Sequence, residues 1–175
     1  MDKYLENIYL VGLMGAGKTT IGRSLAKRLG RKFVDTDKEI EAKTRVSIPA
    51  IFEIEGESGF RNRESQVISE LTAQNGIVVA TGGGAVLRME NRAMISTNGF
   101  VVYLCVQPQT LLERTRHDRN RPLLQVADPL RRLEELFVIR DPLYRNVADL
   151  VIEGSRMSAQ GVLQLLLKEV SIRQL

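Results

Sequence analysis

The feature that most constrains this chain is a glycine-rich segment at residues 12–19, which reads GLMGAGKT. It matches the pattern G-x-x-x-x-G-K-[ST] in full, and in that pattern the glycines let backbone N–H groups surround phosphate oxygens. The lysine reaches the β- and γ-phosphates, and the hydroxyl that follows it binds Mg²⁺. An apolar run precedes the segment and a stretch with helical spacing follows it, as such a phosphate loop requires. We therefore expect Lys18 to bind phosphate during catalysis and Thr19 to bind Mg²⁺.

The phosphate loop also predicts where a nucleotide would lie. The N-terminus of the following helix adds a partial positive charge beside the loop, which favours a bound phosphate. The expected nucleotide-binding residues of this segment are Gly15, Ala16, Gly17, Lys18, Thr19 and Thr20.

Short apolar runs alternate with helical patterns along the chain. The expected strands are residues 8–11, 32–34, 77–81, 100–106 and 150–152; the expected helices are residues 18–29, 37–43, one from Pro49, 60–74, 108–116, 129–147 with an interruption at Pro142, and 159–170. Strands that are apolar throughout are buried on both faces, and their alternation with helices gives parallel βαβ units. We therefore predict an α/β fold: a three-layer α/β/α sandwich with a five-stranded parallel sheet, of the P-loop kinase type.

Three segments that follow strands directly should meet at one edge of this sheet, because ligands of parallel sheets bind beyond the carboxyl ends of the strands. They are the phosphate loop, residues 35–37 and residues 82–84. The strand at 77–81 ends without the carboxylate that usually completes a magnesium site, so we expect Asp35 to supply it. The alternative for Asp35 is a helix cap or a turn, and Asp37 could itself cap the helix at 37–43.

Composition narrows the class of protein further. A length of 175 residues fits one domain, residues 1–175, and a single Cys with a single His excludes an internal disulfide and a Cys/His zinc site. The first residues are polar, and no apolar run approaches the roughly 18 residues of a membrane span. We expect a cytoplasmic protein with no membrane partner.

The basic surplus is modest, with 25 Lys and Arg against 21 Asp and Glu, and 18 of the cations are Arg. A nucleic-acid surface would need a basic stripe interleaved with aromatic residues, but aromatic residues make up 5% of the chain and the cations are mixed with acids. Arginine suits carboxylates and phosphates, so we expect small anions as partners and no nucleic acid. We expect a monomer.

Five further segments follow the phosphate loop in a recognisable order. They read FVDTD at 33–37, GFR at 59–61, ATGGGAV at 80–86, RPLL at 121–124 and RDPLY at 140–144. Their order and spacing resemble the shikimate kinase family, and the resemblance runs from about residue 8 to residue 152. It implies a member of the nucleoside-monophosphate-kinase-like group that transfers the γ-phosphate of ATP, with Mg²⁺, to the 3-hydroxyl of shikimate.

The resemblance also implies roles for residues of the acceptor site, including a substrate-binding segment at about 35–64. Asp37 matches the residue that binds the ring hydroxyls and takes the proton of the attacking one. Arg61 and Arg140 match arginines that hold the substrate carboxylate. The glycines at the close approach to the substrate are Gly82, Gly83 and Gly84. For these arginines the alternative is a solvated helix face, and for these glycines a plain turn.

Two more arginines are assigned by the same resemblance. Arg121 matches the catalytic arginine of a mobile lid, here about residues 115–126, which closes over the phosphates. Arg114 matches the residue that stacks on adenine. Relatives often carry a further nucleotide-contacting Arg or Gln where this chain has Met157 beside Arg156, so we assign neither residue.

Other functions share part of this pattern. A P-loop kinase for another small acidic polyol such as gluconate would keep the phosphate loop and the carboxylate-binding arginines. A nucleoside monophosphate kinase would need a base pocket, and a non-catalytic sensor would normally carry an output domain. Activity across a panel of acceptors would discriminate among them.

Overall fold

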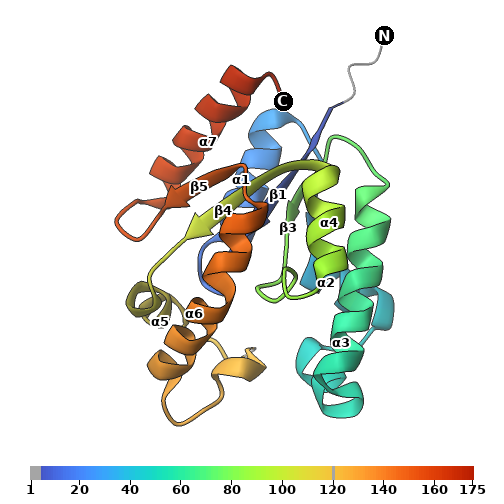
Figure 1. The fold of residues 1–175 in the computed structure, drawn as a ribbon, viewed down its shortest axis with the longest axis vertical. Helices are drawn as coiled ribbons and strands as arrows, with labels where there is room; N and C mark the ends of the chain where they lie inside the picture. Colours follow the sequence, from blue (N-terminus) through green and yellow to red (C-terminus); the bar gives the residue numbers. More distant parts are fainter. Residues whose placement is uncertain (1–4, 120) are drawn as a thin grey trace.

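Five parallel strands form the centre of the part of the chain that the computed structural model describes, residues 5–119 and 121–175 (Figure 1). The strands are β1 (Asn7–Val11), β2 (Phe33–Asp35), β3 (Val78–Ala80), β4 (Gly99–Cys105) and β5 (Leu150–Glu153), in the order β2-β3-β1-β4-β5. β1 is therefore the central strand, and its residues from Ile8 to Val11 are fully buried. The predicted five-stranded parallel sheet is confirmed.

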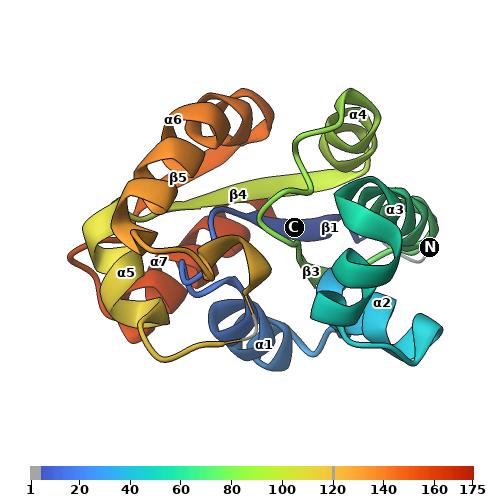
Figure 2. The same cartoon turned by 90° about the horizontal axis from the view of Figure 1, so that it is seen from below.

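Helices cover both faces of this sheet. They are α1 (Lys18–Leu29), α2 (Thr36–Thr44), α3 (Ile48–Thr72), α4 (Met89–Thr97), α5 (Pro108–Thr115), α6 (Pro129–Val147) and α7 (Ala159–Arg173), with a 3₁₀ turn, η1 (Pro122–Leu124), between α5 and α6. In Figure 2 α1 and α7 lie on one face of the sheet, and α4 and α6 lie on the other. The predicted three-layer α/β/α sandwich is confirmed. Among the residues described, no helix combines the length and the apolar character needed to cross a membrane.

The helix after the phosphate loop has the predicted bounds. Ile21 and Leu25, four residues apart, are buried against the sheet. The basic residues of the last turn interact favourably with the partial negative charge at the C-terminus of the helix. Gly30 ends the helix in the left-handed conformation, with φ of 64°, which glycine adopts without steric cost.

The helices expected from Pro49 and at 60–74 both form within α3, where two helical stretches meet at Gly56, whose backbone is not helical and has φ of 71°. One expectation about helices is wrong. Pro142 does not interrupt α6. Proline removes a hydrogen bond to the carbonyl four residues earlier, but Val138 at that position is 72% exposed, so water can satisfy its carbonyl. Helix α4 was not expected, because Asn91 and Ile95 are the buried residues on it and give a weak pattern.

Leu25→Ala should lower the free energy of unfolding by about 2–5 kcal/mol, because it leaves a cavity between α1 and the sheet. Leu165→Ala on α7 is the matched control, since Leu165 is 39% exposed whereas Leu25 is fully buried. Denaturant unfolding of both variants would measure the difference. Equal losses in the two would contradict the burial of Leu25.

Candidate active site

The phosphate loop joins β1 to α1 in backbone conformations that require glycine. Gly15 and Gly17 have φ of 81° and 98°. A side chain on Gly15 would also collide with Thr115 of α5, since an added Cβ would lie 2.7 Å from its methyl group. Gly17 precedes α1 without a side chain that could cap it, so the N–H groups of the first helical turn are free of a side-chain cap and suited to a phosphate.

Lys18 is folded back onto the phosphate loop. Its Nζ donates hydrogen bonds to the carbonyl oxygens of Gly12 at 2.6 Å and Leu13 at 2.9 Å. Burial, followed by repulsion from Arg121, lowers the pKa of Lys18 to about 7. A phosphate in the loop would favour the charged ammonium, so the geometry suits the predicted role of Lys18.

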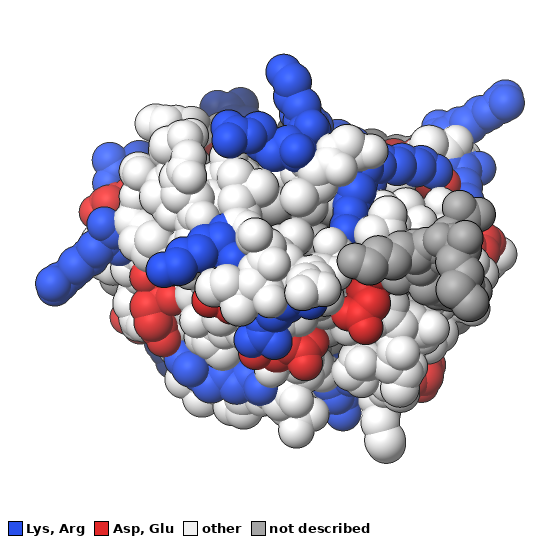
Figure 3. All heavy atoms as spheres, turned by 90° about the horizontal axis from the view of Figure 1, so that it is seen from above, with Lys and Arg blue, Asp and Glu red and all other residues white. Residues whose placement is uncertain are grey.

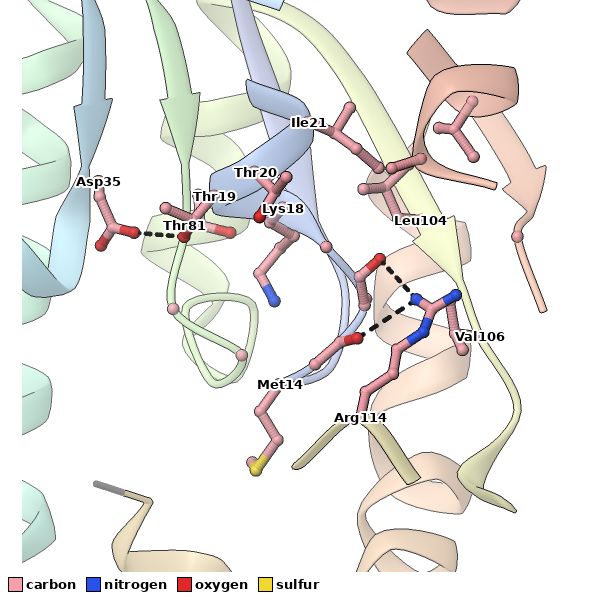
Figure 4. Close-up of a pocket in the computed structure, with 18 of the residues that line it drawn as sticks. Met14, Lys18, Thr19, Thr20, Ile21, Asp35, Thr81, Leu104, Val106 and Arg114 are labelled. Carbon is pink, nitrogen blue, oxygen red and sulfur yellow. Dashed lines mark hydrogen bonds between the residues drawn. The ribbon is translucent and has the colours of Figure 1, made fainter. Parts of the chain in front are cut away.

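Asp35 and Thr19 lie side by side at the edge of the sheet (Figure 4). The Thr19 hydroxyl donates a hydrogen bond of 2.6 Å to Oδ2 of Asp35. The other oxygen, Oδ1, accepts from the N–H groups of Asp37 and Lys38 and thereby caps α2. The expectation that Asp37 caps this helix is wrong, because β2 runs directly into α2 and Asp35 already occupies the cap. Asp35 therefore caps α2 with one carboxylate oxygen, and its other oxygen remains a candidate ligand for a cation.

A cavity of about 510 Å³ surrounds the phosphate loop. Apart from the predicted nucleotide-binding residues, its lining includes Leu104, Val106, Gly154, Met157, Ser158, Ala159 and Val162. Arg114 lies at its border and donates hydrogen bonds of 3.4 Å to the carbonyls of Gly15 and Ala16 (Figure 4). Its stacking on adenine stays a prediction. Met157 lines the cavity, whereas Arg156 is exposed and does not.

A second, smaller cavity of about 100 Å³ lies beside the first. It contains the acceptor residues expected from the sequence, namely Asp37, Arg61, Gly82, Gly83, Gly84 and Arg140, and also Met14, Ile48, Phe52, Phe60, Glu64, Arg121 and Leu123. The structure thus brings together the expected acceptor residues, of which Asp37 and Arg140 are 103 positions apart in the sequence.

Each of the three glycines lies against a different charged group. A Cβ on Gly82 would lie 2.8 Å from Oδ1 of Asp37 and 2.8 Å from Oε2 of Glu64. On Gly84 it would collide with the guanidinium of Arg61, and on Gly83 it would lie 3.4 Å from Nη1 of Arg140. The backbone can therefore approach these charges because the segment has no side chains, which argues against a plain turn.

Two buried carboxylates lie at this glycine segment. Oδ1 of Asp37 and Oε2 of Glu64 have no hydrogen-bond partner among the described residues. Burial, then repulsion from Glu64 and Asp35, raises the pKa of Asp37 to about 6. Burial also raises the pKa of Glu64, although Arg61 opposes this change. Unpartnered acceptors aimed into a polar cavity suit a ligand that brings hydroxyl donors.

The two arginines of this cavity differ in how they are neutralised. Arg61 forms ion pairs with Glu64 at 2.8 Å and Glu57 at 3.2 Å. Arg140 is 3% exposed, yet no described carboxylate lies within ion-pair distance of it, and its Nε has no partner. Burial lowers the pKa of Arg140. A buried cation without a counter-ion is strongly destabilising unless an anion binds, so Arg140 is a candidate for binding an anion.

Arg121 borders both cavities, as do Asp37, Met14, Gly82 and Gly83. Its Nε is paired with Asp118 at 2.8 Å. The expected lid at 115–126 includes Asn120, which lies outside the described residues. A cation at the junction of the two cavities suits the role predicted for Arg121.

The sequence analysis did not identify Glu64 and Tyr144. Glu64 is fully buried and holds Arg61, and its position three residues after Arg61 on a helix is a signal that could have shown it. Tyr144 is fully buried and donates a hydrogen bond to the carbonyl of Gly83. Tyr144 is the last residue of the segment RDPLY, but the sequence analysis assigned a role to Arg140 of that segment and none to Tyr144.

A phosphate loop joined to a second cavity with a buried cation, in this three-layer fold, defines a P-loop kinase for a small anionic acceptor. The family model for shikimate kinase matches residues 14–171. A shikimate kinase of Dechloromonas aromatica is 64% identical over 167 residues, which are 95% of this chain and 91% of that protein. One of Burkholderia lata is 58% identical over 166 residues, 95% of this chain and 90% of that protein.

The solved structures include a similar protein. The shikimate kinase from Acinetobacter baumannii in complex with shikimate superposes with a TM-score of 0.94 and 52% identity, covering 98% of this chain and 96% of that chain. The present chain belongs to the shikimate kinase family.

Asp37→Asn should raise the free energy of unfolding of the ligand-free protein at pH 7–8. The folded pKa of about 6 exceeds the ordinary value of 3.8, so ionised Asp37 costs stability as the pH rises from about 4 through 6. The gain should be about 1–3 kcal/mol and vanish below pH 4.

Denaturant unfolding across pH 3–8 would measure this gain. Asp35→Ala is the control, since loss of the cap should lower stability by about 1 kcal/mol at the same pH. A loss of stability in Asp37→Asn at pH 7–8 would show that the carboxylate is a structural group.

Proposed function

We propose that this enzyme transfers the γ-phosphoryl group of ATP to the 3-hydroxyl of shikimate and releases ADP. The observation that carries the proposal is Arg140, a buried cation with no counter-ion among the described residues, in a small cavity that adjoins the phosphate loop. Shikimate supplies a carboxylate for this cation and ring hydroxyls for the unpartnered oxygens of Asp37 and Glu64. The name of the relative in complex with shikimate supports the same acceptor.

The nucleotide end of the reaction belongs to the phosphate loop. Residues 15–20 surround the phosphates, and Lys18 turns from the carbonyls of Gly12 and Leu13 to the β- and γ-phosphates. Thr19 and Asp35 fit a magnesium site, because a hydroxyl and a carboxylate 2.6 Å apart are the hard oxygen ligands that this ion prefers. Bound Mg²⁺ would neutralise negative charge on the phosphates.

The acceptor cavity is lined by both basic and acidic side chains. Arg61 and Arg140 hold the carboxylate, while Asp37 accepts hydrogen bonds from the ring hydroxyls. Asp37 orients the attacking oxygen and takes its proton. Phosphoryl transfer has a loose transition state, so orientation contributes more than basicity. Asp37 borders both cavities, which is where an in-line attack on the γ-phosphate must occur.

The residues at about 115–126 act as a lid. Closure over the nucleotide would bring Arg121 from its pairing with Asp118 to the transferring phosphoryl group and exclude water. Arg114 would stack on the adenine ring. We infer that the enzyme works as a monomer in the cytoplasm, as the sequence predicts.

Nucleic acid is a poor partner for this surface. Figure 3 shows the end of the molecule opposite the carboxyl edge of the sheet, where basic and acidic side chains are interspersed. Among the described residues drawn on this face, acidic and uncharged side chains separate the basic ones, whereas a continuous basic stripe would suit a phosphate backbone.

An ADP-release assay with shikimate, gluconate and nucleoside monophosphates tests the proposal. We expect turnover with shikimate at least 100-fold above that with the other acceptors, because a ring with one carboxylate and adjacent hydroxyls matches the arginines and the carboxylates that line the cavity. Lys18→Ala should abolish turnover and serves as the blank. Preferred turnover of gluconate would identify the other small acidic polyol as the substrate.

Arg140→Ala should raise the KM for shikimate by about 10- to 100-fold, the value of a hydrogen bond to a charged group. The KM for ATP should change less than threefold. Arg131→Ala is the matched control, because Arg131 begins the same helix and its side chain is 77% exposed. Steady-state kinetics with each substrate varied in turn would measure both constants, and equal rises in both would contradict the carboxylate role.

A further inference from the structure

In the glycine segment at residues 82–84, the backbone carbonyl group of each glycine accepts one hydrogen bond. The carbonyl of Gly82 accepts from the N–H of Ala85 at 3.0 Å, and that of Gly84 accepts from the N–H of Leu87 at 3.1 Å. Both bonds are local turns. The carbonyl of Gly83 instead accepts from the hydroxyl of Tyr144, 61 residues further along the chain.

Tyr144 reaches this carbonyl from α6, one helical turn after Arg140. Its side chain is fully buried, and burial raises its pKa, so the hydroxyl stays protonated and remains a donor. The guanidinium of Arg140 lies close enough to oppose this rise in the pKa of Tyr144. Nη1 of Arg140 also lies against Gly83, 3.4 Å from where a Cβ on that glycine would be. The Tyr144 hydroxyl is therefore next to both the glycine segment and the cation of the candidate anion site.

The bond matters because glycine has the largest conformational freedom of any residue. A trans peptide is planar, so a fixed carbonyl of Gly83 also fixes the direction of the N–H of Gly84. Gly83 lies between Arg140 and the phosphate loop, where a Cβ would lie 3.5 Å from the backbone nitrogen of Met14. Rotation of this peptide would disturb the backbone beside both Arg140 and Arg61.

We propose that Tyr144 is a positioning residue for the acceptor: its hydroxyl fixes the peptide between Gly83 and Gly84 and the guanidinium of Arg140 in the arrangement that receives the carboxylate. The inference rests on the proposed function, since it assumes that a carboxylate binds at Arg140. Tyr144 does not line either cavity and acts through its two neighbours.

Tyr144→Phe tests this role, because it removes the hydroxyl and keeps the ring. The KM for shikimate should rise about five- to twentyfold, while the KM for ATP changes less than twofold and kcat less than threefold. Calorimetric titration of the ligand-free protein with shikimate should show weaker binding by the same factor.

Tyr103→Phe is the matched control. The rings of Tyr103 and Tyr144 are 4.8 Å apart and both are buried, but the hydroxyl of Tyr103 donates to Asp141 at 2.8 Å, away from the glycine segment. Its KM for shikimate should stay within twofold of the wild type. A comparable rise in this variant would show that any loss of a buried hydroxyl disturbs α6, and would overturn the proposal.

Thermal unfolding of both variants completes the test. A lower midpoint in Tyr144→Phe with an unchanged KM for shikimate would assign Tyr144 a structural role and overturn this inference alone. Absence of shikimate turnover by the wild type would overturn the proposed function and, with it, this inference.

Discussion

The parallel pairing of β1 with β3 is the interaction on which the site depends. Leu10 pairs with Ala80, and the carbonyl of Leu10 accepts hydrogen bonds from both the N–H and the hydroxyl of Thr81, at 3.1 and 2.9 Å. The phosphate loop and the glycine segment therefore leave the sheet at the same level. A slip of one residue would separate the two loops and turn every side chain of β3 to the other face.

Burial of the charged side chains at this edge of the sheet lowers the stability of the folded protein. Lys18 and Arg140 are buried cations whose pKa values are lowered, and Asp37 and Glu64 are buried carboxylates whose pKa values are raised. The hydrophobic burial of the apolar strands behind them, which are covered on both faces, compensates for this loss of stability. Bound phosphate and carboxylate groups would stabilise the charged forms of the two cations, and bound hydroxyl groups would donate hydrogen bonds to the two carboxylates.

The sheet and the phosphate loop could be predicted from the sequence because their signals are local. Ile8 to Val11 form an apolar run, and the spacing of Ile21 and Leu25 defines one face of α1. The strand bounds differ from the expected ones by at most one residue, since pairing with neighbours decides where a strand ends. Pro142 does not interrupt α6, because the effect of a proline depends on whether water can reach the carbonyl four residues earlier.

The sequence predicted which residues line the two cavities better than it predicted the hydrogen bonds and ion pairs that these residues form. The motifs named Arg61 and Arg140. The i,i+3 spacing of Arg61 and Glu64 is a local signal for their ion pair, but no local pattern shows that Arg140 has no counter-ion among the described residues. Asp35 carried two interpretations: Oδ1 confirms the helix cap, while the role of Oδ2, which accepts from Thr19, as a magnesium ligand stays a prediction. Tyr144 belongs to the segment RDPLY, but its role could not be inferred, because its partner is the carbonyl oxygen of Gly83, which is distant in sequence and part of the backbone.

The shared border of the two cavities has a thermodynamic consequence. Asp37 and Arg121 face both spaces, so the charge that one ligand brings alters the electrostatic energy of the other. Linkage makes this influence reciprocal: whatever factor the nucleotide imposes on the affinity for the acceptor, the acceptor imposes on the affinity for the nucleotide. The order in which the two substrates arrive therefore leaves the stability of the ternary complex unchanged, and governs only the path by which it forms.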